Sequence, residues 1–147
     1  MSGIAVDLKR TGFPVKIGQV ELWFDTSQER LLEFFDIENE VNRRLNTYEK
    51  QIIEANLDKE IEAKGVTKEV AQSALCLEAK YLEINYDLLF GEGAFAQLYA
   101  EYPDKEALEN TLEIVCREIE AKLKDMAIER EEIVKQKTKK YKKRSNL

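Results

Sequence analysis

The chain of 147 residues has few groups with which it could carry out catalysis: 29 acidic residues, two cysteines and no histidine. The absence of histidine excludes nucleophiles activated by an imidazole base, and zinc or haem sites built on imidazole. Cys76 and Cys116 lack the Cys-x-x-Cys spacing, and their apolar neighbours predict two small buried side chains. These residue types point away from an enzyme with a nucleophilic or metal-dependent site.

The acidic residues form no recognisable metal or acid–base motif. Di-iron bundles need a Glu-x-x-His motif, and the Asp-x-Asp-x-Asp-Gly loop for calcium is absent. Gly91-Glu92-Gly93 lacks the GxxxxGK[ST] pattern, so Gly91 and Gly93 predict a helix-breaking turn and not a phosphate loop. A general acid–base pair of carboxylates needs no fixed spacing and stays an alternative. We expect no enzymatic activity, no catalytic or metal-binding residue and no cofactor.

The charge is distributed unevenly along the chain. The net charge is −6, but residues 135–147 hold seven basic residues and no acid, which leaves −13 for residues 1–134. An acidic body repels phosphates, so we do not expect nucleic acid as a partner. The tail, residues 135–147, is predicted to be disordered when free. Its candidate contacts with an acidic protein surface are Lys139, Lys140, Lys142 and Lys143.

The hydropathy of the chain predicts that the protein does not bind or span a membrane. No apolar run approaches the roughly 20 residues that a helix needs to span a bilayer. The first ten residues lack the apolar core and cleavage site of a signal peptide. We therefore expect an intracellular, soluble protein.

The N-terminal part of the chain predicts a β-hairpin over residues 13–25. Two β-prone runs, 13–17 and 20–24, flank a Gly-Gln pair, which is typical of a two-residue type II′ turn. Side chains alternate along the second run, so Trp23 and Phe24 lie on opposite faces. One small bundle cannot cover both faces, and we expect one of them to contact another subunit or a client protein.

The rest of the chain predicts helices, because only two prolines and six glycines interrupt it. Thr26-Ser27-Gln28-Glu29 has the spacing of a capping box, and a long helix should follow it to a C-cap at Gly65. Thr67 is the expected cap of a second long helix, whose two adjacent apolar stripes predict a central, buried position.

A short helix and a last long helix are expected after this central helix. The short helix, about residues 94–101, presents Phe95 and Tyr99, and Pro103-Asp104 separates it from the last helix. The fold class is therefore mainly α. We predict a single-domain helical bundle, residues 1–134, of three long helices and one short helix with the N-terminal hairpin and the basic tail.

This order of elements resembles that of the tail assembly chaperones of siphophages and prophages of Gram-positive bacteria. The closest match is residues 86–99, with the Leu-Phe-Gly-Glu-Gly-Ala turn at 89–94, and residues 15–35 match more loosely. The resemblance spans most of residues 13–125 and does not include the basic tail.

The resemblance implies a function in phage tail assembly without catalysis. It implies that the chain binds the tape measure protein in the host cytoplasm, keeps it soluble, helps to recruit major tail protein subunits and is absent from the mature virion. It also implies self-association into an oligomer or a spiral. Besides the four lysines, the candidate protein-interaction residues are Trp23, Phe24, Phe95 and Tyr99.

Two other functions stay open at this point. A structural or adaptor helical protein would remain in the phage particle, and its detection in purified virions would favour that function. A small regulatory protein would use its basic tail on nucleic acid, and salt-sensitive binding that is lost with residues 135–147 would support it.

Overall fold

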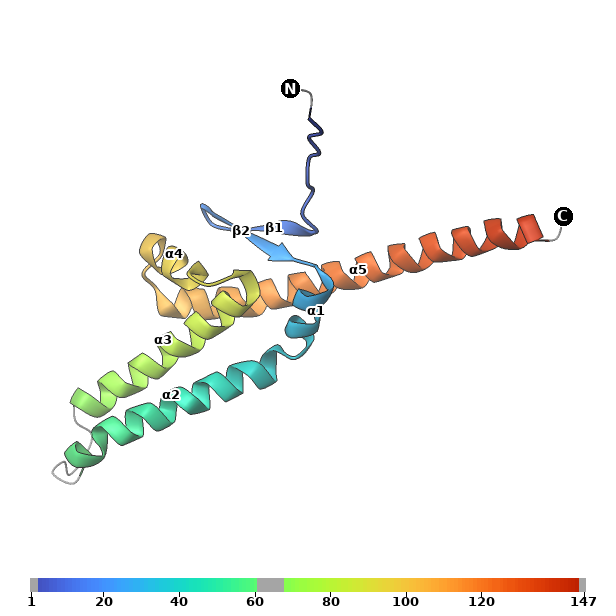
Figure 1. Cartoon of the computed structure of the whole chain (residues 1–147). Coiled ribbons are helices and arrows are strands. Elements are labelled where there is room, and N and C mark those ends of the chain that lie inside the picture. The colour runs from blue at the N-terminus through green and yellow to red at the C-terminus, as the bar shows by residue number, and fades with distance from the viewer. Residues whose placement is uncertain (1–2, 61–67, 146–147) are drawn as a thin grey trace. The chain divides into compact units, whose positions relative to one another are not determined.

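The computed structural model describes the backbone of residues 3–60 and 68–145 (Figure 1). Side chains are described in these ranges except at residues 54–60, 68–74, 141 and 143–145. The described residues form five helices and a short N-terminal antiparallel hairpin, which confirms the mainly helical fold class. The predicted caps at Gly65 and Thr67 lie outside the described residues.

The chain divides into two compact units, Met1–Leu108 and Glu109–Leu147. The first unit holds the hairpin, four helices and the first turn of the fifth helix, and the second unit holds the remainder of that helix. This division differs from the expected single domain over residues 1–134. The features described below belong to the first unit unless the second is named.

The hairpin consists of β1, Gly12–Ile17, and β2, Val20–Asp25, joined by a two-residue loop. Gly18 has a φ of 59°, and no described residue other than glycine has a positive φ. Only the first loop position is therefore left-handed, as the predicted type II′ turn requires. The hydroxyl of Tyr102 accepts a hydrogen bond from the backbone N–H of Gln19 at 2.8 Å, which ties the turn to the segment after the fourth helix.

The inner face of the hairpin is aromatic. Phe24 is 2% exposed, and its ring centroid lies 5.3 Å from that of Phe13 and 5.3 Å from that of Phe34 in the first helix. The hairpin packs against the helices through β2. An isolated hairpin is marginal in water, and this aromatic contact supplies the apolar burial that it needs.

The first predicted long helix is two helices, α1, Gln28–Phe35, and α2, Ile37–Glu60. The capping box predicted at Thr26 is wrong, because α1 begins after Ser27 and the buried hydroxyl of Thr26 has no hydrogen-bond partner in the described part of the chain. The N–H of Thr26 is still bonded to the hairpin, to the carbonyl of Thr11 at 3.4 Å. The carboxylate of Asp25 instead accepts the N–H of Ser27 at 2.8 Å, and this bond lowers the pKa of that carboxyl group.

The third helix, α3, spans Lys68–Phe90 and packs along α2 (Figure 1). Both of its predicted apolar stripes contain buried side chains, with Ile84 on one stripe and Leu82 and Leu89 on the other. Tyr86, which lies one helical turn from both Leu82 and Leu89, is fully buried at 0% exposure. Its hydroxyl donates a hydrogen bond to the carbonyl of Leu108 at 2.5 Å. Leu75 and Tyr81 of the same stripes are exposed, so the burial predicted for this helix is found only in the C-terminal half of its described side chains.

The turn between α3 and the short helix α4, Ala94–Glu101, is held by Asp87. The carbonyl of Asp87 accepts the N–H of Gly91 at 2.9 Å, and its carboxylate accepts the N–H of Phe95 at 3.0 Å. Gly91 has a φ of 108° and Gly93 a φ of 93°, so both occupy the region that favours glycine. Gly93 has no side chain with which to cap α4, and Asp87 supplies the missing acceptor from the preceding helix.

The last helix, α5, spans Lys105–Ser145. The carboxylate of Asp104 caps its N-terminus by accepting the backbone N–H of Ala107 at 3.1 Å. Asp104 follows Pro103, and the sequence predicts the boundary between the two helices at this pair. Residues 135–145 were expected to be disordered, but they form the last part of α5, in the second unit. Lysine, arginine and glutamine favour helices, and cations near a helix C-terminus interact favourably with its dipole. A surplus of positive charge is therefore compatible with this helix.

We predict that Tyr86→Phe lowers the free energy of unfolding by about 1–2 kcal/mol, because it removes a buried hydrogen bond while keeping the ring. Chemical denaturation of both proteins would measure the difference. Tyr99→Phe is the matched control, since the Tyr99 side chain is 37% exposed. An equal effect of the two substitutions would show that the bond to Leu108 contributes nothing specific.

We predict that Gly91→Val destabilises the fold by about 1–3 kcal/mol, because valine is strained at the φ of 108° that Gly91 adopts. A Cβ at this position meets nothing within 4 Å, so backbone strain and not a clash is the expected cause. Thermal or chemical unfolding would measure the loss. Glu92→Ala in the same turn should have little effect, and unchanged stability of Gly91→Val would refute this account of the turn.

Candidate protein-interaction site

Trp23 lies on the hairpin face opposite Phe24, as the alternation predicts, and it is half-buried. The guanidinium carbon of Arg10 lies 5.3 Å from the centroid of its ring, within the range of a cation–π contact. The indole N–H is buried and has no hydrogen-bond partner among the described residues. The N-terminal segment of the same chain therefore contacts a face that we expected to meet another protein.

Two of the four candidate aromatics belong to the core. Phe24 is 2% and Phe95 8% exposed, so neither offers a contact surface to a partner. Phe95 stacks between Tyr86, at a centroid distance of 6.3 Å, and Tyr99, at 5.6 Å. Tyr99 is 37% exposed and forms the outer end of this stack. Among these side chains, Tyr99 and half-buried Trp23 are the ones that reach the surface.

The candidate lysines lie on the last part of α5, in the second unit. Lys139, Lys140 and Lys142 are exposed, and the side chain of Lys143 lies outside the described residues. The aromatic candidates lie in the first unit, so the two sets of candidate residues belong to different units.

The expectation of two buried cysteines is wrong for Cys76, which is exposed. Cys76 lies four residues before Lys80 and seven before Glu83, so it shares their polar face of α3. Cys116, in the second unit, is partly buried, and this burial raises the pKa of its thiol. Among the residues that the structure describes, no cluster of three or more cysteine or acidic side chains is placed to hold a metal ion.

A groove of about 1070 Å³ lies between the α1–α2 segment on one side and α3 on the other, and the sequence did not predict it. Its apolar lining includes Ile84, which is buried, and Tyr48 and Leu88, which are half-buried. Its charged lining is more exposed, and it comprises six carboxylates and four basic groups. The groove thus has an apolar base and charged rims.

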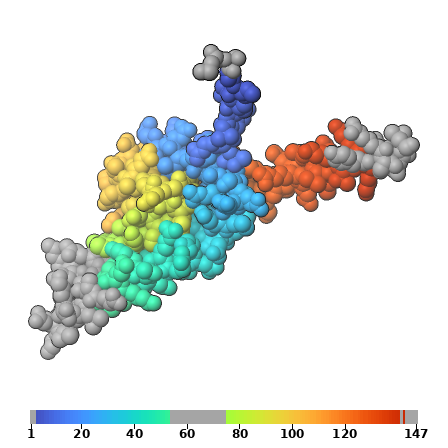
Figure 2. Space-filling model, viewed as in Figure 1, coloured from blue at the N-terminus to red at the C-terminus, as the bar shows by residue number. Residues whose placement is uncertain are grey.

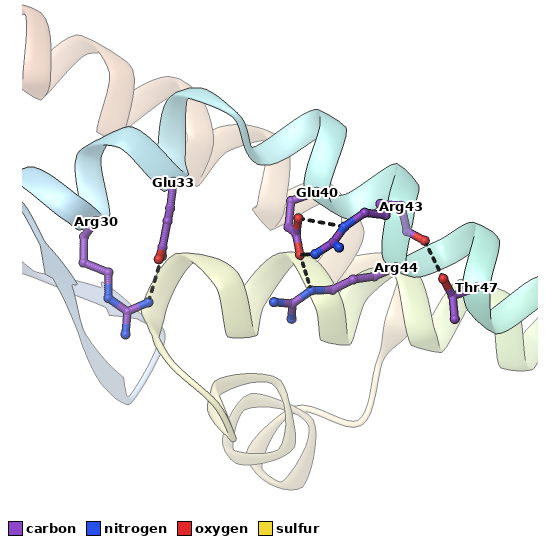
Figure 3. Close-up of polar contacts among 6 residues, drawn as sticks. All are labelled: Arg30, Glu33, Glu40, Arg43, Arg44 and Thr47. Atoms are coloured by element: carbon purple, nitrogen blue, oxygen red, sulfur yellow. Dashed lines mark hydrogen bonds and ion pairs between the residues drawn. The ribbon is translucent and has the colours of Figure 1, made fainter.

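Ion pairs along the helix surface arrange the α1–α2 rim of this groove (Figure 3). Glu40 accepts two bonds from Arg43, at 2.6 and 3.1 Å, and one from Arg44 at 2.8 Å. The bonds from Arg43 contribute most to lowering the pKa of Glu40. Arg30 and Glu33, which are one helical turn apart on α1, form a second ion pair at 3.2 Å. These exposed pairs orient the rim, and pairs of this kind contribute little to stability.

An exposed apolar patch on α1 was also missed by the sequence analysis. Leu32 is 65% and Phe35 75% exposed. The helix carries two consecutive apolar pairs, at positions 31–32 and 34–35. A helix of eight residues turns only one member of each pair inward, and here Phe34 is the buried one. That doublet pattern is the signal that could have identified the patch.

Comparison of the chain with protein-family models, with curated proteins and with solved structures finds no match. None of the described helices combines the length and the apolar character needed to cross a bilayer. The functional interpretation therefore depends on the surfaces described above and on the resemblance in residues 86–99.

Trp23→Ala separates an interface role from a core role. If the outer face of Trp23 is an interface, the substitution should reduce self-association or client binding more than it reduces folding stability. We expect a stability loss of about 1–2 kcal/mol, because the side chain is only half-buried. Denaturation and sedimentation of the same samples would provide both values.

Phe24→Ala is the matched core substitution in the same strand. Phe24 is almost fully buried, and its loss should cost about 3–5 kcal/mol of stability. If Trp23→Ala reduces folding and association equally, Trp23 is a core residue, and the interface hypothesis for this face fails.

Proposed function

We propose that the protein is a tail assembly chaperone of siphophages or prophages of Gram-positive bacteria. In this function it binds the tape measure protein in the host cytoplasm, keeps that protein soluble and helps to recruit major tail protein subunits, without any catalytic step. The proposal rests on the resemblance in residues 86–99 and on one structural observation, the groove between α1–α2 and α3.

The groove supports the proposal because its chemistry suits an amphipathic helix. An apolar base that includes Leu88 and Tyr48 can bury the apolar face of a helix, and charged rims can pair with its polar flanks. On the α3 side, the rim carries Glu83 and Asp87 of the helix and Glu92 of the turn that follows it, against Lys80. This surplus of carboxylates favours a client helix with basic residues on that side. A long helical client with repeated apolar faces would offer many such segments.

A single groove of this kind needs to bind only moderately. Many copies along one client would exclude water from it collectively, and the combined affinity would exceed that of each contact. Moderate individual contacts also let the copies leave when tail tube subunits replace them. A chaperone that must be absent from the finished particle requires this property.

The proposal predicts that co-expression with the tape measure protein from the same phage or prophage keeps that protein soluble and co-purified. The groove variant Tyr48→Ala/Leu88→Gln should reduce the co-purified tape measure protein at least fivefold, because it removes apolar lining. Quantitative gel analysis of the soluble and affinity-purified fractions would measure this. Both side chains are half-buried, so a thermal melt must show that the variant remains folded.

Asn46→Ala is the matched control, because Asn46 is exposed on α2 and does not line the groove. No gain in solubility with the unmodified protein would refute the chaperone function. An unchanged yield with a folded groove variant would refute the groove as the client site. Detection of the chain in purified virions would favour the structural or adaptor protein instead.

A further inference from the structure

The two ends of the client groove lie in different surroundings. In Figure 2 the surface of α2, in turquoise, lies directly beside that of α3, in yellow-green. At one end of the groove, Arg30, Leu88 and Gly91 also line a smaller pocket of about 60 Å³ against the hairpin. At the other end, the ammonium group of Lys80 lies 5.3 Å from the centroid of the Tyr48 ring. We call these the hairpin end and the Tyr48 end.

The charges that line the groove are distributed unevenly between its ends. The hairpin end holds one basic and four acidic side chains, a net charge of −3, which are Arg30, Glu33, Asp36, Asp87 and Glu92. The Tyr48 end holds three basic and two acidic side chains, a net charge of +1, which are Glu40, Arg43, Arg44, Lys80 and Glu83. Glu40 is counted at the Tyr48 end because it is bonded to both arginines there.

The carboxylates of the hairpin end are bonded mainly to neutral donors. Asp36 accepts the side-chain amide of Asn39 at 2.8 Å, and Asp87 accepts the backbone N–H of Phe95 at 3.0 Å. Glu92 is exposed on the turn after α3. The guanidinium group that lines this end is already paired within α1. Basic side chains of a bound helix would therefore supply the counter-charge that this end lacks.

The Tyr48 end has a surplus of donors instead. Arg43 and Arg44 share the single carboxylate of Glu40, so one of these two positive charges is not neutralised within the group. Lys80 lies 3.6 Å from Glu83 in an exposed ion pair, which a bound carboxylate could join. Guanidinium groups form strong, charge-assisted hydrogen bonds with carboxylates, so acidic side chains of a bound helix suit this end.

Other charges near the groove leave this difference unchanged. Arg10 and Asp25 line the smaller pocket at the hairpin end, and their opposite charges offset each other. The helices α2 and α3 run in opposite directions along the groove, so their macrodipoles oppose each other. The side chains of the lining therefore decide the sign of each end.

From these observations we infer that the groove selects client segments by the order of charges along them. A bound amphipathic helix lays its apolar face on the base of the groove, with basic side chains at the hairpin end and acidic side chains at the Tyr48 end. This order fixes the direction of the client, because a segment with the reverse order of charges binds in the reverse direction. The inference rests on the proposed function, in which this groove is the client site, and adds the charge pattern that the site accepts.

The test uses the full-length protein and designed amphipathic peptides of about 18 residues, which span about 27 Å as a helix. Three peptides share one apolar face and one composition. The first has lysines in its N-terminal half and glutamates in its C-terminal half, the second has the reverse order, and the third intersperses them. Each ordered peptide carries a nitroxide quencher at one terminus or at the other.

The fluorescence of Trp23 reports which end of a peptide lies at the hairpin. Trp23 is the only tryptophan of the chain, and it lines the smaller pocket at that end. For both ordered peptides, a quencher at the lysine end should reduce the fluorescence about threefold more than a quencher at the glutamate end. The interspersed peptide should bind about fivefold more weakly, because it can match only one end of the groove at a time.

An exchange variant, Asp36→Lys/Glu92→Lys/Arg44→Glu/Lys80→Glu, keeps the net charge of the protein but reverses the sign of both ends. The glutamate end of each ordered peptide should then quench Trp23 more strongly. The milder variant Asp36→Lys/Glu92→Lys changes only exposed side chains and should abolish the difference between the two termini. A thermal melt must show that each variant remains folded.

Glu38→Lys/Lys50→Glu is the matched control, because it exchanges two exposed charges of α2 that do not line the groove. It should keep the preference of the unmodified protein. Equal quenching from both termini of a bound peptide would overturn the inference and leave the groove as the client site. A folded exchange variant that still prefers the lysine end would do the same. If none of the peptides binds, the groove is not the client site, and the inference fails with it.

Discussion

The first unit depends on the burial of Tyr86, a polar aromatic side chain with no exposure to solvent. Its ring stacks with those of Phe90 and Phe95, and its hydroxyl reaches the carbonyl of Leu108. A buried hydroxyl is costly without a partner, so the ends of α3, α4 and the first turn of α5 are positioned together. Tyr102 follows α4 and bonds the hairpin loop at Gln19, so the same constraint extends to the hairpin.

Two series of aromatic contacts connect the core of the first unit with its surface. One runs from Phe90 through Tyr86 and Phe95 to Tyr99, and the other runs from the hairpin through Phe34 to Phe35. Each passes through buried rings and ends at an exposed ring, Tyr99 or Phe35. The rigid interior therefore positions the apolar side chains that remain available to partners. The groove and the α1 patch are formed by different residues.

Local features were predictable from the sequence, because the residues that decide them are adjacent. The loop of the hairpin, the turn at Gly91 and Gly93 and the bounds of α4 each follow from glycine conformation and a short apolar pattern. The capping box predicted at Thr26 does not form. The backbone N–H of Thr26 is bonded to the carbonyl of Thr11 beside the hairpin, and the N-cap of the helix is the next residue, Ser27. Helical periodicity accepts both members of the apolar doublet Phe34–Phe35, and only the packing of the folded unit decides that Phe34 is the buried one.

By itself, the sequence determined the mainly helical class, the hairpin and the acidic character of residues 1–134, since these depend on composition and local spacing. It also excluded chemistry that requires histidine. Only the tertiary structure decided that Asp87 caps α4, that Phe24 and Phe95 are buried, and that a groove lies beside α3. These features join residues of different elements, and their energies depend on distances and burial that periodicity along one element does not specify.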